Sequence, residues 1–278
     1  MIEIRACQGF DELQACVDLQ IEVWGYDPAD LVPKKTFMLA QKVGGQVIGA
    51  FDEKRGTTGQ GIGKAGYQGA RGPGNEGTEA QECEPRLVGF AMAIPGIKNT
   101  VSGPKPYLHS HMLAVKEGYR NKGLGMRLKL VQRVDALSRG IRRMEWTFDP
   151  LEIKNAYLNI HRLGAVMREY RPDFYGVSSS RLQGGLPTDR LLAEWELDSG
   201  RVQATLKGLS AVASSVEERI QVPASIYQWK ASDSDRHRAL AVQLENREKF
   251  QLAFQRGLAV TGFSLDADGN GVFELGRM

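Results

Sequence analysis

Residues 113–125 read Leu-Ala-Val-Lys-Glu-Gly-Tyr-Arg-Asn-Lys-Gly-Leu-Gly, and this stretch decides how the chain folds. Its apolar start is typical of a strand end, and helical spacing of apolar residues begins after the turn. A helix N-terminus presents unpaired N–H groups and the positive end of the macrodipole, so it binds phosphate. Gly123 and Gly125 remove side chains that would hold a phosphate away, and Arg120 and Lys122 add positive charge. The segment indicates a phosphate site; a plain strand-to-helix turn with basic residues toward solvent is the alternative.

On both sides of this segment, the spacing of apolar residues predicts further strands and helices. Strands are expected at residues 46–51, 86–94, 107–115, 143–148 and 190–197. Helices are expected at residues 10–23, 37–43, 124–137 and 152–162. We expect Pro95-Gly96 to close the strand that precedes it. This order predicts an α+β (α/β layered) fold, in which a mixed, mostly antiparallel sheet is flanked by helices.

Two segments stand outside that core. Residues 53–85 carry nine Gly among 33 residues and few large apolar side chains, which predicts a flexible surface insertion. The tail predicts a strand near Ile220, a helix at 235–255, and two strands at 258–264 and 272–275. The Asp-Gly and Asn-Gly pairs between the last two strands are typical of a hairpin turn. The expected division is therefore a domain at 1–197, with the insertion inside it, and a small C-terminal α/β extension at 198–278.

The order of elements around the phosphate segment resembles that of the GNAT (Gcn5-related) N-acetyltransferase superfamily, over residues 1–52 and 86–197. The shared motif is Arg-x-x-Gly-x-Gly, which follows a strand that ends in Ala-Val. A second likeness is the later helix that carries Asn155 and closes with Leu163-Gly164. The resemblance implies a GNAT-like fold with acetyl-CoA as co-substrate. It also implies a pair of splayed strands, here 107–115 and 143–148, with the pantetheine arm between them.

The resemblance further indicates which residues would hold acyl-CoA. The pantetheine arm would pair with the backbone of Leu113, Ala114 and Val115, and would lie close to Asn155. The pyrophosphate would lie on the amides of Arg120, Asn121, Lys122, Gly123, Leu124 and Gly125. Acceptor pockets in this fold are usually built from the first helices and the late strands, here about residues 24–36 and 170–190.

The acid and the base are placed less directly, because this sequence departs from the family pattern. Many members carry a Glu on the strand before the phosphate loop, whereas residues 107–115 contain none but carry His109 and His111. An imidazole near its ordinary pKa acts as a base at neutral pH; a His pair hydrogen-bonded within the sheet is the alternative. The family's common acid, a Tyr, is replaced by Ile160. Tyr157, one turn before Ile160, and His161, the residue after it, are the candidates for its role. The alternative is that Tyr157 is a packed core residue and His161 a surface residue.

The composition and charge of the chain argue against several classes of protein. The 278 residues include 36 Lys and Arg against 33 Asp and Glu, a formal net charge of +3. So small an excess argues against a protein that coats nucleic acid, and the longest nearly apolar stretch is shorter than the roughly 20 residues that a membrane helix needs. The three cysteines form no Cys-x-x-Cys pair, which favours a reducing, cytoplasmic setting. The histidines and cysteines lack zinc-ligand spacing, so no metal is expected.

Three functions are compatible with these features. The first is an acyl-CoA-dependent N-acyltransferase that moves acetyl from acetyl-CoA to a primary amine of a small molecule or peptide by direct attack on the thioester. The second is a catalytically inactive CoA-binding or interaction module with the same fold, which the departures at the acid and base positions favour. The third, a nucleotide-binding regulator unrelated to CoA, depends on the phosphate segment alone. The sequence leaves homodimerisation open.

Overall fold

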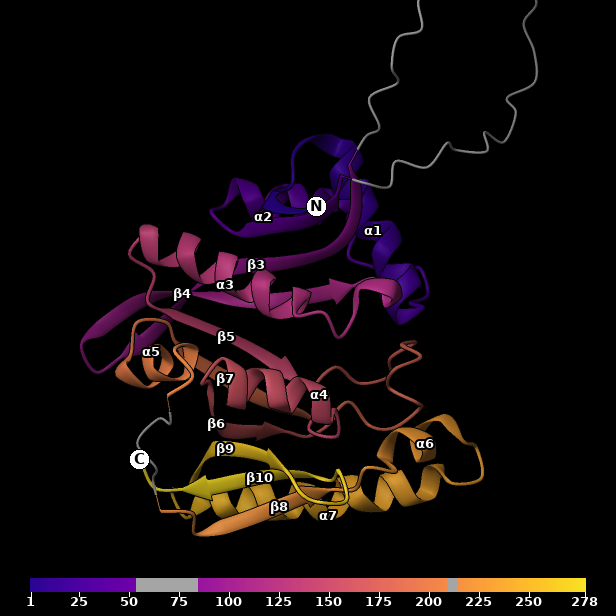
Figure 1. Ribbon diagram of the computed structural model, residues 1–278, viewed down its shortest axis with the longest axis vertical. Helices are drawn as coiled ribbons and strands as arrows, with labels where there is room; N and C mark the ends of the chain where they lie inside the picture. The colour runs from indigo at the N-terminus through magenta and orange to yellow at the C-terminus, as the bar shows by residue number, and fades with distance from the viewer. Residues whose placement is uncertain (54–84, 210–214) are drawn as a thin grey trace, which may run out of the picture.

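The computed structural model describes residues 1–53, 85–209 and 215–278 of the chain, so the expected insertion at 53–85 lies almost wholly outside the described residues. The described strands form one ten-stranded sheet in the order β1-β2-β3-β4-β5-β7-β6-β9-β10-β8. Strands β4 and β5 are parallel, and the other neighbouring pairs are antiparallel. The expected mixed, mostly antiparallel sheet flanked by helices is confirmed, and its two edges are β1 and β8 (Figure 1).

The elements have the following bounds. The strands are β1 (Ile2–Ala6), β2 (Gln46–Asp52), β3 (Arg86–Thr100), β4 (Gly103–Val115), β5 (Arg143–Phe148), β6 (Val166–Arg171), β7 (Arg190–Glu196), β8 (Glu218–Val222), β9 (Ala259–Leu265) and β10 (Gly271–Gly276). The helices are α1 (Gly9–Trp24), α2 (Lys34–Lys42), η1 (Glu117–Tyr119), α3 (Leu124–Ser138), α4 (Ile153–Ala156), η2 (Tyr157–Arg162), α5 (Gly200–Leu206), α6 (Ile226–Ala231) and α7 (Arg236–Gln255).

Helices cover the first strands on both faces. The buried side of α1, which includes Leu13 and Cys16, packs with α2 against β3 and β4 around Phe90. On the opposite face, Leu124 and Leu128 of α3 pack against β2 and β3. Helix α3 crosses this half of the sheet in front of β3 and β4 (Figure 1). The helical spacing of apolar residues in the sequence therefore corresponds to the buried stripe of each helix.

The expectation that Pro95-Gly96 closes a strand is wrong. Strand β3 continues through Pro95 to Thr100 and forms a long hairpin with β4, which begins at Gly103 rather than at residue 107. The reason is the length of β2, whose pairing with β3 ends at Ala93. Beyond that point β3 has a neighbour on one side only, and a proline is tolerated on such an edge because no ladder hydrogen bond is lost there.

The expected helix at 152–162 is present but changes form along its length. A short α-helix, α4, passes directly into the π-helix η2. Leu163 N–H donates to Leu158 O over 3.0 Å, five residues back, which closes the wider turn. Wide turns of this kind are rare in helices and are frequent at functional sites.

The C-terminal strands continue the sheet. Strand β9 joins β6 through the pair Met167 and Val260, and α7 lies along this end of the sheet (Figure 1). Phe250 of α7 is fully buried and lies with its ring 5.6 Å from Tyr170 of β6 and 5.2 Å from Phe273 of β10. One apolar cluster therefore runs from β5 to β10. The hairpin expected between β9 and β10 is confirmed.

We expect an ion pair between α7 and the start of β7 to contribute strongly to stability. Asp189 is fully buried, accepts two hydrogen bonds from Arg247 at 2.8 and 2.9 Å, and accepts a third from Tyr170 at 2.6 Å. Arg247→Met leaves a buried carboxylate without its cation, which costs about 3–5 kcal/mol. The measurement is the free energy of unfolding in denaturant.

A matched control is Arg256→Met, at the C-terminus of the same helix. Arg256 bonds Glu218 over 2.8 Å, but its side chain is 56% exposed. Such a pair contributes about 0–1 kcal/mol. Equal losses in the two variants would contradict the importance of the buried pair.

Candidate active site

The parallel strands β4 and β5 are paired over a short stretch only. Leu108 pairs with Met144 and His109 with Glu145, and no further pair between these strands occurs in the described chain. Beyond His109 the strands part, and each is bonded only to its outer neighbour, β3 or β7. A gap therefore opens along the carboxyl half of β4, as the resemblance implied.

A β-bulge at His111 reorients β4 just beyond the point where the strands part. Met92 pairs with Met112 and Ala93 with Ser110, so that His111 is an extra residue in β4. Ser110 bonds to side chains of α3, whereas Met112 packs on the face of α1 and α2. In an unbroken strand these two residues would share a face. The bulge therefore reverses which residues face α3.

The N-terminus of α3 borders this gap. An added Cβ on Gly125 would lie 3.5 Å from Leu113 Cδ2 and 3.8 Å from Leu158 Cδ2, so the helix start is in close contact with β4 and η2. Gly123 is the N-cap residue, with φ +75°, and its missing Cβ would point into open space. The first four N–H groups of a helix have no acceptor within the helix. Glycine thus keeps these donors accessible to a ligand.

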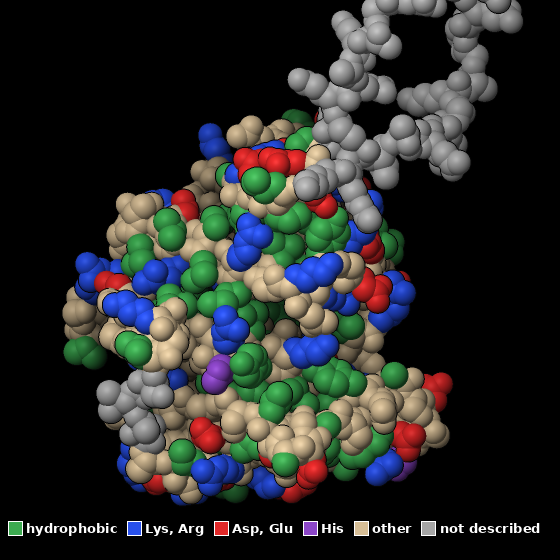
Figure 2. Space-filling model, in the orientation of Figure 1, with side chains coloured by type: hydrophobic (Ala, Val, Ile, Leu, Met, Phe, Trp, Pro, Cys, Tyr) green, Lys and Arg blue, Asp and Glu red, His purple; other side chains and the backbone are tan. Residues whose placement is uncertain are grey.

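Basic residues surround that helix start. Arg120 Nε donates to Val115 O over 3.0 Å, and Lys122 Nζ donates to Gly118 O over 2.7 Å, which folds both side chains back on the loop. In the face of the molecule that carries α3 and α4, Lys and Arg side chains lie over the middle, and acidic side chains lie mostly toward the periphery (Figure 2). Positive charge beside the start of α3 favours an anionic ligand there.

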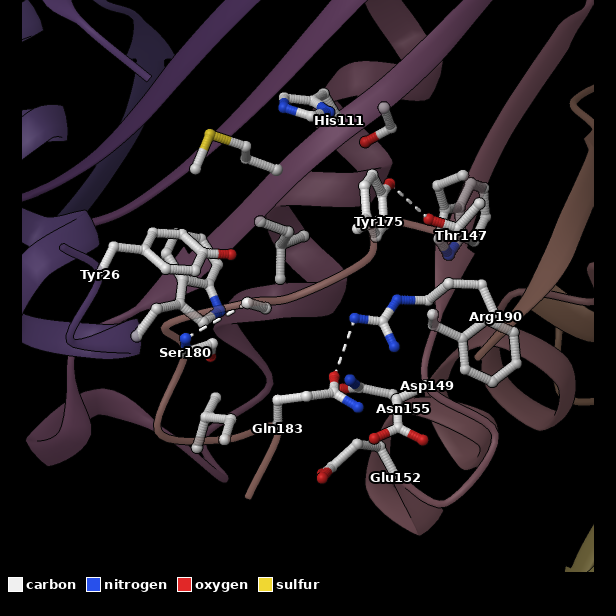
Figure 3. A pocket seen from close by; sticks show the side chains of 18 of the residues that line it. Tyr26, His111, Thr147, Asp149, Glu152, Asn155, Tyr175, Ser180, Gln183 and Arg190 are labelled. Carbon is white, nitrogen blue, oxygen red and sulfur yellow. Dashed lines mark hydrogen bonds between the residues drawn. The ribbon is translucent and has the colours of Figure 1, made fainter. Parts of the chain in front are cut away.

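The gap between β4 and β5 opens into a cavity of about 410 Å³. Its walls come from α1 and the loop after it, from α3, β4, β5 and α4, and from the segment between β6 and β7. Figure 3 shows His111 of β4, Tyr175 of that segment and Arg190 of β7 around the same space. The cavity thus joins Leu113 of β4 to residues in both stretches expected to build the acceptor pocket, 24–36 and 170–190.

The segment between β6 and β7 is fastened to the loop after α1. The amide and the hydroxyl of Ser179 donate to Asp30 over 2.8 and 2.6 Å, and these bonds lower the pKa of that carboxyl. Arg181 N–H donates to Trp24 O over 2.9 Å. Gly25 lies directly beneath, because an added Cβ would collide with the Arg181 guanidinium. These contacts close one side of the cavity.

Of the two histidines, His111 faces the cavity and His109 does not border it. Their ring centroids lie 6.2 Å apart, so the two imidazoles are neighbours without a hydrogen bond between them. Partial burial lowers the pKa of His111. Burial also lowers the pKa of His109, with a smaller contribution from His111. A lowered pKa keeps an imidazole neutral, and so able to accept a proton, at a lower pH than usual.

Aromatic and polar side chains that the sequence reasoning did not single out complete the cavity. The hydroxyls of Tyr175 and Thr147 share a hydrogen bond of 2.8 Å, and Arg190 donates to Gln183 over 3.0 Å (Figure 3). Burial raises the pKa of Tyr26, which keeps its phenol protonated. The candidate site therefore includes phenol donors on the wall opposite β4, and only their place in the stretches 24–36 and 170–190 signalled them.

The C-terminal part of the chain also reaches the site. Lys230 of α6 is buried, and its amine donates to Asp149 and Glu152, both of which line the cavity, over 2.8 Å each. Although burial opposes it, the two carboxylates raise the pKa of Lys230. Helix α6 thus places one positive charge between two carboxylates at the edge of the cavity.

The structure brings together some of the expected site residues. His111, Leu113 and Asn155 line the cavity. Ala114 and Val115 continue β4 beyond Leu113, and residues 120–125 form the turn and the start of α3. Tyr157 lies outside the cavity and stacks on His161, with ring centroids 4.6 Å apart. Within the described ranges, no group of three or more His, Cys, Asp or Glu side chains could hold a metal ion.

Comparisons with known proteins identify the class of fold. No family model matches the chain, and no curated protein matches it. Solved structures do match, and the chain has the fold of the GNAT acetyltransferases. One of them is NAA60 of Arabidopsis thaliana in complex with acetyl-CoA, at 15% identity and a TM-score of 0.50, covering 72% of this chain and 100% of that one.

Two bacterial structures give similar figures. The ribosomal-protein-S18-alanine N-acetyltransferase of Escherichia coli has 14% identity and a TM-score of 0.45, covering 72% of this chain and 96% of that one. The yncA protein of Salmonella typhimurium, a putative acetyltransferase with acetyl-CoA, has 16% identity and a TM-score of 0.47, covering 71% of this chain and 95% of that one. In the described part of this chain, no helix is both long and apolar enough to cross a membrane.

Proposed function

We propose that the protein is an acyl-CoA-dependent N-acyltransferase, which accepts acetyl-CoA and acylates a primary amine of a small molecule or peptide. The observation that carries the proposal is the parting of β4 and β5 beside the N-terminus of α3, with a cavity in the gap. Such a gap gives a thioester arm a strand backbone to pair with, and the helix N–H groups at its end suit a pyrophosphate. The same cavity extends to Tyr26 and Arg190, where an acceptor has room.

Different residues would bind different parts of acyl-CoA. The backbone of Leu113, Ala114 and Val115 pairs with the pantetheine arm, and the amide of Asn155 lies beside it. The amides at 120–125 hold the pyrophosphate, with Arg120 and Lys122 adding charge. In support, Leu113 and Asn155 line one cavity and Gly125 is in contact with Leu113.

The reaction forms a C–N bond and breaks a C–S bond. The amine nitrogen attacks the thioester carbonyl carbon, a base removes a proton from the amine, and an acid protonates the departing thiolate. We assign the base to His111. Three catalytic residues were expected, His109, His111 and Tyr157, and among them only His111 borders the cavity. We assign the acid to Tyr175, whose hydroxyl lies on the facing wall next to Thr147 (Figure 3).

The test is direct. Calorimetry should detect binding of CoA and acetyl-CoA, and incubation with a panel of primary amines should release free thiol. If neither CoA nor any CoA thioester binds, the proposal is wrong.

A second candidate is an inactive CoA-binding module. It is favoured by the absence of Glu from residues 107–115 and by the position of Tyr157 against His161, outside the cavity. Tight acetyl-CoA binding without thiol release on any amine would support this candidate over the enzyme.

A further inference from the structure

The closed end of the gap between β4 and β5, which we call the vertex, contains a buried lysine. Lys129 of α3 is 3% exposed and lines the cavity. Its amine donates to Ser110 Oγ over 2.8 Å and lies 3.6 Å from the ring centroid of Trp146. Ser110 and Trp146 are the residues that directly follow the last pair between β4 and β5, His109 with Glu145. The amine therefore lies at the closed end of the gap.

Three other buried or half-buried cations around the site have carboxylate partners, whereas Arg190, which also lines the cavity, donates to Gln183 and to the backbone carbonyl of Asp189. Lys230 bonds two carboxylates, and Lys98 and Arg143 both bond Glu145. Lys129, by contrast, has a hydroxyl and an aromatic ring, and forms no ion pair with any residue that the structure describes. The burial of a cation without an anion is costly, and burial accordingly lowers the pKa of Lys129 well below its ordinary value.

The hydrogen bonds around this amine leave it able to take an anion. The Ser110 hydroxyl accepts from Lys129 and donates to Gln132 Oε1 over 3.1 Å. An ammonium group has three N–H donors, of which Ser110 takes one. The Lys129 amine at the vertex thus has donors left for a ligand.

Position along β4 determines which part of a thioester reaches the vertex. The strand from Val115 back to Ser110 spans roughly 17 Å at the usual rise per residue. With the pyrophosphate at the start of α3 and the arm along β4, the acyl group is the part that reaches Ser110. This step rests on the proposed function.

We propose that the preferred donor is a CoA thioester of a dicarboxylic acid, whose free carboxylate pairs with the Lys129 ammonium at the vertex. The carboxylate supplies the counter-ion that Lys129 lacks, and the ammonium donates to its oxygens. Succinyl-CoA and malonyl-CoA have this chemistry, and acetyl-CoA and butyryl-CoA do not.

Calorimetry with succinyl-CoA and with butyryl-CoA, which is similar in length but lacks the carboxylate, tests the proposal. A charge-assisted hydrogen bond in a buried site predicts that the wild type binds succinyl-CoA about 10- to 100-fold more tightly. Lys129→Met, similar in size and uncharged, should bind the two thioesters equally while it binds free CoA as the wild type does. Equal binding of the two by the wild type, or a preference that survives in Lys129→Met, would overturn the proposal.

A second measurement is the proton uptake that accompanies binding. Pairing with a carboxylate raises the pKa of Lys129, so succinyl-CoA binding should take up a proton that butyryl-CoA binding does not. The uptake is measured as a heat that changes with the ionisation enthalpy of the buffer. The other titratable groups near this end of the cavity are His109, His111, Glu145, Asp149 and Glu152. The succinyl carboxylate also acts on these groups, so the same comparison in Lys129→Met measures their share of the uptake. Equal proton uptake for the two thioesters would contradict the ion pair.

These outcomes separate the two proposals. Failure of free CoA and of every thioester to bind removes the proposed function and this inference together. Binding of CoA without a preference for the carboxylate removes this inference alone.

Discussion

Gly123→Asp abolishes CoA binding, with an expected loss of at least about 100-fold in affinity. The added carboxylate stands at the N-terminus of α3, where the pyrophosphate would lie, and like charges in contact destabilise the complex by several kcal/mol. The variant should still fold, because the missing Cβ points into open space and Asp tolerates a positive φ better than most residues. Calorimetry with free CoA is the measurement.

Gly123→Asn is the matched control. Asn has nearly the size of Asp and the same tolerance of this backbone conformation, but it carries no charge. We expect it to bind CoA within about tenfold of the wild type. If the two variants lose the same affinity, the loss comes from bulk and the phosphate is not at this helix end.

His111→Ala lowers kcat by about 100-fold or more, with the KM for the acyl-CoA unchanged. A general base contributes about 10²–10⁴-fold to a rate, and the His111 imidazole borders the cavity without contacting the phosphate end. Steady-state thiol release is the measurement. His109→Ala, the neighbouring imidazole outside the cavity, should change kcat by less than about fivefold. The reverse order of effects would transfer the base to His109.

The pH profile gives an independent check on this assignment. Partial burial lowers the pKa of His111, so the free base persists as the pH falls through the usual His range. The acidic limb of kcat/KM should therefore have its midpoint below about 6.5, the ordinary value for His. A midpoint above that value would exclude His111 as the base.

Local patterns in the sequence sufficed for the elements on which the site stands. The Arg-x-x-Gly-x-Gly segment predicted the strand end, the turn and the start of α3, because each of these depends on residues close together in the chain. The end of β3 could not be predicted in this way. Whether Pro95 stops a strand depends on whether β2 still runs beside it, which is a property of the sheet.

The site residues likewise fall into those that local sequence patterns identified and those that only the tertiary fold brings to the site. His111 was identified because it lies on the strand that leads into the motif, and Asn155 because it lies on the later helix that the resemblance also covers; both line the cavity. Tyr175 and Arg190 were not, because a segment that folds back onto the loop after α1 places them there. Lys129 was not identified for a different reason. It lies one helical turn after Gly125, among apolar residues that suggested an ordinary buried helix face. A charged residue on that face was the available signal.

The order of the sheet places β1 at one edge and β8 at the other. Both outermost strands are five residues long, and both carry charged side chains, Glu3 and Arg5 on β1 and Glu218 and Arg219 on β8. Long, flat, apolar edges invite other chains to add a strand and so lead to aggregation, whereas short, charged edges resist it. A sheet of this width therefore ends in two strands that disfavour aggregation, and any self-association should use side-chain surfaces in preference to strand pairing.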